Sequence, residues 1–140
     1  MTVKEIMSIY REMYMKINVK PSTYNGYSVN IDNHILPSIG SADADELTFS
    51  DIDGLIYTMR RKNLGNTTIR YVLRVLKMGL AFAQKRGYCS CNIMNGYDLP
   101  RKNSYTYTVL SSRELKMLHD YAALSDSDSA LCVLLMMCHG

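Results

Sequence analysis

The 140-residue sequence lacks several features that would each point to a familiar class of protein. No apolar run reaches the roughly 18–20 residues of a membrane-spanning helix, and residues 1–11 lack the charged-then-apolar pattern of a secretion signal. The four cysteines include no C-x-x-C pair and the three histidines are scattered, which disfavours a zinc site. We therefore expect a cytoplasmic protein with free thiols that requires no metal and no other cofactor.

Acidic residues are also absent from the segment between Arg60 and Arg86, which holds eight basic residues. Three of them, Arg70, Arg74 and Lys77, are three and four residues apart, so they share one face of a helix. A basic row without acidic partners must face water or an anion. The plainer alternative is a solvated face, but the polyanion best matched to a protruding basic helix is the DNA backbone.

The balance of charge changes along the chain. Residues 1–103 contain 14 Lys and Arg against 9 Asp and Glu, whereas residues 104–140 contain 2 against 4. The change near Lys102 predicts a basic first module followed by a module of different construction.

Strand signals are few, and the fold class we expect is all-α, with a bundle of four to five helices. Only residues 105–110 alternate in the way a short strand or an extended linker would. In the first hundred residues, apolar side chains recur at helical spacing in four segments. They include Ile6, Ile9, Tyr10, Met13 and Ile17 of the first segment and Ile52, Leu55, Ile56 and Met59 of the third. The predicted helices cover about residues 3–17, 21–36, 50–62 and 66–87.

Capping and breaking residues set these limits. Thr2 begins the first helix with a capping box to Glu5, and Pro37 should end the second helix at residue 36. Ser50 and Asn66 are the expected caps of the third and fourth helices.

Two more helices are expected after residue 110. Ser111 and Glu114 form another capping box, and residues 130–138 are a nearly continuous apolar run typical of a helix buried on most sides. Because little sequence is left to cover that run, we expect the chain to end inside a domain.

Six segments, in this order, resemble the tyrosine recombinase (phage integrase) family. They are KPSTYNGY (20–27), HILPSIG (34–40), LTFSDI (47–52), LGNTTI (64–69), FAQKRG (82–87) and VLSSREL (109–115). The resemblance implies that residues 1–98 form a SAM-like core-binding domain, that residues 99–108 are a linker, and that residues 109–140 begin a catalytic domain. Where the family usually has Asn-Pro after the long helix, this chain has Asn92-Ile93.

The resemblance also implies what the chain alone should not do. The family's catalytic arginines, lysine, His-x-x-Arg box and nucleophilic tyrosine are missing from these residues. Attack of a tyrosine on a DNA phosphate needs preorganised cations to stabilise the charge that develops. We therefore expect this chain to bind DNA without cutting it, while integration or excision belongs to a longer recombinase that acts with other recombinase protomers on DNA.

Family members use the second and fourth helices for groove contact, and both helices supply suitable residues here. The second helix would offer a phosphate its free N–H groups, the positive end of its dipole and a lysine, although capping and surface polarity also explain its polar residues. The candidate DNA-binding residues are Lys20, Ser22, Thr23, Asn25, Asn30, Asn66, Thr67, Thr68, Arg70, Arg74 and Lys77.

Two other functions fit the same residues. A small non-enzymatic helical DNA-binding regulator would also need the basic helix face. A helical protein-interaction module could use that face to bind an acidic partner.

Overall fold

The computed structural model describes residues 1–101, 109–125 and 127–139, except for the side chains of residues 138 and 139. Regular structure in these residues is helical apart from an isolated bridge between Thr2 and Asp43, as the sequence predicted. The chain divides into two compact units, Met1–Asn103 and Ser104–Gly140. The stretch 105–110, predicted to be a strand or an extended linker, lies mostly outside the described residues.

The first helical run of the first unit consists of α1 (Val3–Tyr10), the π-helical turn η1 (Arg11–Met15) and α2 (Lys16–Asn18). It begins with the predicted capping box between Thr2 and Glu5. The π turn adds a residue and changes which side chains face inward. The expectation that Met13 and Ile17 continue the apolar face was therefore wrong: they are 53% and 78% exposed, whereas Met15 is fully buried.

The second run contains α3 (Pro21–Asn30), the π-helical turn η2 (Ile31–Ile35) and α4 (Leu36–Ile39). The prediction that Pro37 ends this helix at residue 36 was wrong. Pro37 lies directly after the π turn η2, inside one continuous helical run that extends to Ile39. The carbonyl of Asn33, four residues earlier, accepts a hydrogen bond of 3.5 Å from Lys62 Nζ.

The third helix, α5 (Phe49–Arg61), begins one residue before Ser50, which was its predicted cap. Thr48 is the N-cap instead, and it forms a capping box with Asp51. The apolar face of α5 is buried as predicted, through Ile52, Leu55, Ile56 and Met59.

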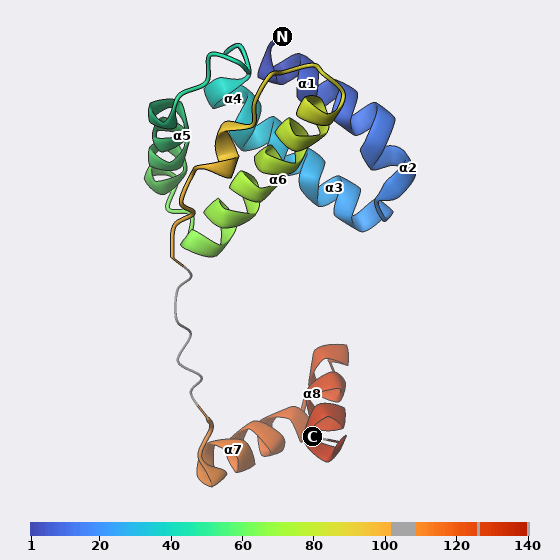
Figure 1. Cartoon of the computed structure of the whole chain (residues 1–140). Coiled ribbons are helices and arrows are strands. Elements are labelled where there is room, and N and C mark those ends of the chain that lie inside the picture. Colours follow the sequence, from blue (N-terminus) through green and yellow to red (C-terminus); the bar gives the residue numbers. More distant parts are fainter. Residues whose placement is uncertain (102–108, 126, 140) are drawn as a thin grey trace. The chain divides into compact units, whose positions relative to one another are not determined.

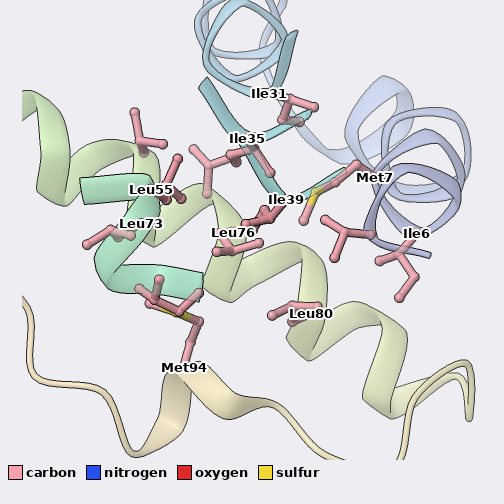
Figure 2. Packing of buried hydrophobic residues seen from close by; sticks show 14 of the residues in the cluster. Ile6, Met7, Ile31, Ile35, Ile39, Leu55, Leu73, Leu76, Leu80 and Met94 are labelled. Atoms are coloured by element: carbon pink, nitrogen blue, oxygen red, sulfur yellow. The ribbon is translucent and has the colours of Figure 1, made fainter. Parts of the chain in front are cut away.

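The long helix α6 (Asn66–Lys85) crosses the centre of the first unit (Figure 1). Gly65, not the predicted Asn66, is its N-cap, and it contributes no side-chain bond. Beyond its C-terminus, Gly87 has a φ of +74°, a conformation that suits glycine. Figure 2 shows Leu73, Leu76 and Leu80 of this helix packed among Met7, Ile35 and other buried side chains.

After α6 the chain runs back toward the N-terminal end of that helix, and residues 88–101 are called the return segment below (Figure 1). It contains one 3₁₀ turn, η3 (Ile93–Asn95), and Met94 of this turn is 1% exposed in the core (Figure 2). Buried Asn92 donates a hydrogen bond of 3.0 Å to the carbonyl of Lys77. Tyr97 packs edge-on against Phe49 and donates a hydrogen bond to Asp53.

The second unit contains α7 (Ser112–Ala123) and α8 (Asp128–His139). The predicted capping box between Ser111 and Glu114 is present at the start of α7. Of the described side chains in this unit, only Ala122 and Ala130 are buried. Leu131, Leu135 and Met136 are each more than half exposed, so the predicted apolar run is helical but largely uncovered in this chain.

Candidate nucleic-acid interface

The three predicted cations, Arg70, Arg74 and Lys77, form a basic stripe along α6, but their surroundings differ. Arg74 and Lys77 are exposed, whereas Arg70 is half-buried. The ion pairs found among the described residues involve the N-terminal amine, Arg11, Lys16 and His119, and none includes this stripe. The positive charge of the three cations is therefore not neutralised within the described part of the chain.

An open hollow of about 470 Å³ lies beside this stripe, and we call it the α3–α6 hollow. Its lining joins residues that are far apart in sequence, because the C-terminal end of α3 meets the N-terminal half of α6. The lining residues are Asn30, Thr67, Thr68, Arg70, Tyr71 and Arg74. Five of them are among the candidates named from the sequence, so packing brings this part of the prediction to one place.

Tyr71 also lines the hollow, although it was not among the candidates named from the sequence. Its side chain is 36% exposed, and its ring centroid lies 5.6 Å from that of Tyr27 on α3. A tyrosine hydroxyl is protonated at neutral pH and can donate a hydrogen bond, and partial burial raises the pKa of Tyr71 further. Tyr71 follows Thr67 by four residues and precedes Arg74 by three, so the three side chains share one face of α6. This spacing is the sequence signal that could have identified Tyr71 as a lining residue.

The remaining candidates do not line this hollow. Lys20 is the extended N-cap of α3, and exposed Ser22 and Asn25 lie in the first turns of that helix with half-buried Thr23. Lys77 follows Arg74 by about one turn of α6. Asn66, at the first helical position of α6, donates a hydrogen bond of 3.1 Å to the carbonyl of Arg101.

Gly26 faces α6 from the middle of α3. A Cβ placed on it would lie 3.5 Å from the Tyr71 hydroxyl, which is an ordinary van der Waals distance. Close packing of the two helices therefore does not require glycine here. The carbonyl of Gly26 accepts a hydrogen bond from the Asn30 side-chain amide, which fixes that amide at the edge of the hollow.

The chemistry of the hollow suits an anion with hydrogen-bond acceptors. Two guanidinium groups, three hydroxyls and one amide line it, and no carboxylate does. Among the described residues, no group of three or more His, Cys, Asp or Glu side chains is placed to hold a metal ion. Nor does any helix in that part of the chain combine the length and apolar character needed to cross a bilayer.

Comparison with known proteins shows what the first unit resembles. Residues 2–60, which extend from the cap of α1 almost to the end of α5, match the model of the phage integrase N-terminal SAM-like domain. No curated protein sequence shows significant similarity to the chain.

Three solved structures share the fold. The phage integrase SAM-like domain Moth 1796 from Moorella thermoacetica has a TM-score of 0.62 at 24% identity, over 76% of this chain and 92% of that domain. A lambda integrase dimer bound to a COC′ core site has a TM-score of 0.73 at 15% identity, over 90% of this chain and 43% of that one. The Tn1549 transposon integrase in complex with a circular intermediate DNA has a TM-score of 0.72 at 19% identity, over 90% and 40%.

The chain thus spans less than half the length of the lambda and Tn1549 integrases that it matches. The three structures share the helical architecture of the first unit, and the family model matches its first 60 residues apart from Met1. Residues 2–60 are therefore similar to a phage integrase N-terminal SAM-like domain, and the first unit shares its fold with the three integrase structures.

Proposed function

We propose that the first unit binds double-stranded DNA through the face that α3 and the N-terminal half of α6 form, with Arg74 and Lys77 neutralising backbone phosphates. The observation that carries this proposal is the α3–α6 hollow. It gathers donors from two helices beside cations that have no acidic partner in the described residues. Donors of this kind fix a protein on the duplex by binding phosphate oxygens, and arginine can also read guanine in the major groove.

The solved structures support the proposal. The lambda and Tn1549 integrases that share this fold are described in complex with DNA. We propose that this chain is the DNA-binding N-terminal part of a site-specific tyrosine recombinase acting in the cytoplasm. Its partners would be duplex DNA and other protomers of the recombinase.

Salt dependence tests which side chains contact phosphate, because each neutralised phosphate changes the slope of log K against log salt concentration by about 0.9. Fluorescence anisotropy with a labelled generic duplex, titrated at several salt concentrations, gives this slope for the full chain. We expect steep salt dependence, and we expect Arg74→Gln and Lys77→Gln each to flatten the slope by about 0.9. Lys4→Gln is the matched control, because Lys4 is an exposed cation on α1 and its loss should leave the slope unchanged.

Two outcomes would contradict the proposal. Absence of binding at low salt would mean that the stripe is only a solvated face, and the protein-interaction module would become the better hypothesis. Salt-dependent binding with the same slope in the wild type, Arg74→Gln and Lys77→Gln would place the DNA on a different surface.

A further inference from the structure

The end of the return segment is attached to the same helix that carries the proposed DNA contacts. Leu99 packs against the core, and the next two carbonyls accept hydrogen bonds from α6. Arg70 donates from Nη1 to the carbonyl of Pro100, and Asn66 donates from Nδ2 to the carbonyl of Arg101, at 3.1 Å. These two residues therefore contact the last described residues of the first unit.

Arg70 differs from its neighbours on the stripe in this respect. It is half-buried with a backbone carbonyl as its partner, whereas Arg74 and Lys77 are exposed and make no side-chain hydrogen bond or ion pair within the described residues. A guanidinium has five donors in a fixed planar arrangement, so a hydrogen bond to one carbonyl also fixes the direction of the group. Arg70 is thus already oriented toward the return segment.

Asn66 supplies an independent second contact. Its side-chain amide is neutral, so it brings no positive charge that would attract a phosphate. Its contact is the hydrogen bond to the carbonyl of Arg101. Residues 66 and 70 are four apart and share one face of α6, and they contact two consecutive peptide carbonyls. One such bond could form by chance on a surface. Two bonds, from side chains one helical turn apart to consecutive carbonyls, fix the direction of this short stretch of backbone.

We propose that Asn66 and Arg70 are positioning residues that hold Pro100 and Arg101 on the N-terminal end of α6, and that they thereby set where the chain leaves the DNA-binding face. In this arrangement the stripe has two roles: Arg70 holds the return segment, while Arg74 and Lys77 meet the phosphates. The part of the inference that concerns DNA rests on the proposed function. The part that concerns the return segment does not.

Backbone order in the return segment tests the first part directly. In the full chain labelled with ¹⁵N, the amides of Leu99 and Arg101 should have order parameters near 0.85, typical of rigid backbone. Arg70→Gln and Asn66→Ala should each lower these values toward about 0.6 or below, while amides in the middle of α6 keep theirs. Lys77→Gln, on the same helix but without a contact to residues 99–101, is the control.

The salt slope of DNA binding tests the second part. Arg70→Gln should leave the slope within about 0.3 of the wild type, whereas Arg74→Gln should lower it by about 0.9. Unchanged order parameters in both Arg70→Gln and Asn66→Ala would overturn the positioning role. A slope that falls by about 0.9 in Arg70→Gln would overturn the division of roles by showing that Arg70 binds phosphate.

The two proposals can fail separately. If the wild-type chain does not bind DNA, the proposed function fails, but the order parameters still decide whether these side chains hold the return segment. If Arg70→Gln unfolds the protein, Asn66→Ala decides the same question, because it removes only a neutral amide from the surface.

Discussion

At the scale of single residues, Gly79 shows how closely α1 and α6 approach one another. A Cβ at this position would lie 2.5 Å from Cε and 2.7 Å from Sδ of Met7, which is fully buried. Alanine is favoured over glycine by about 1 kcal/mol inside a helix, but overpacking a core costs about 1–3 kcal/mol. Because Met7 is enclosed on all sides, the second effect should prevail.

We therefore predict that Gly79→Ala lowers the free energy of unfolding by about 1 kcal/mol, measured by urea denaturation of the full chain. Gly54→Ala is the matched control. Gly54 also lies inside a helix, but no atom comes within 4 Å of the Cβ it would gain. That substitution should stabilise the protein by about 0.5–1 kcal/mol.

A third variant identifies the clash. In a Met7→Ala background the space for the new methyl group exists, so adding Gly79→Ala should become stabilising. Additive effects of the two substitutions would show that Met7 is not the reason for glycine at position 79.

At the scale of helices, the start of α5 distinguishes two capping residues that are only two positions apart. The sequence favoured Ser50, but the structure places Thr48 in the extended N-cap conformation with reciprocal bonds to Asp51. Hydrogen bonds from the hydroxyl and the backbone N–H of Thr48 lower the pKa of Asp51.

Thr48→Ala should consequently lower the free energy of unfolding by about 1 kcal/mol at neutral pH, as for other N-cap substitutions. Ser50→Ala should change it by less than about 0.5 kcal/mol. The lowered pKa of Asp51 means that its carboxylate stabilises the folded state above the ordinary Asp pKa, and that this contribution is lost as the pH falls through the folded value. The difference between the two variants in urea denaturation should therefore shrink in acid, and an equal effect of both at neutral pH would contradict the assignment of the cap.

The same helices show what sequence reasoning could and could not reach. The all-α character, the buried face of α5 and two capping boxes follow from local spacing, and the described residues confirm them. The inward position of Met15 and the continuation past Pro37 depend on π turns, which no local propensity predicts. The α3–α6 hollow could be anticipated only as two separate helix faces, because its shape depends on how α3 packs on α6.

At the scale of the whole chain, the two units differ in how well they cover their apolar side chains. The first has a continuous core that extends from α1 to the return segment. The second has an open apolar hollow of about 570 Å³ between α7 and α8, lined by Leu115, Leu118, Val133, Met136 and Met137. Uncovered apolar surface of this kind favours association.

We expect the full chain to self-associate as its concentration rises, which sedimentation velocity measures as an increase in weight-average mass. Leu135→Glu/Met136→Glu should suppress this increase, because both side chains are more than half exposed and can be replaced without disturbing a core. Ile17→Glu/Tyr57→Glu is the control, since it removes two comparably exposed apolar side chains from the first unit. A chain that stays monomeric at all concentrations would refute this prediction.

The π turns η1 and η2 have a consequence for aligning this domain with distant relatives. Each turn contains one residue more than an α-helical turn over the same rise, so it accommodates an insertion without breaking the helix. A relative with an uninterrupted α-helix at either place has one residue fewer between equivalent core positions. The alignment gap then belongs inside the helix, at residues 11–15 or 31–35, although gaps are ordinarily assigned to loops.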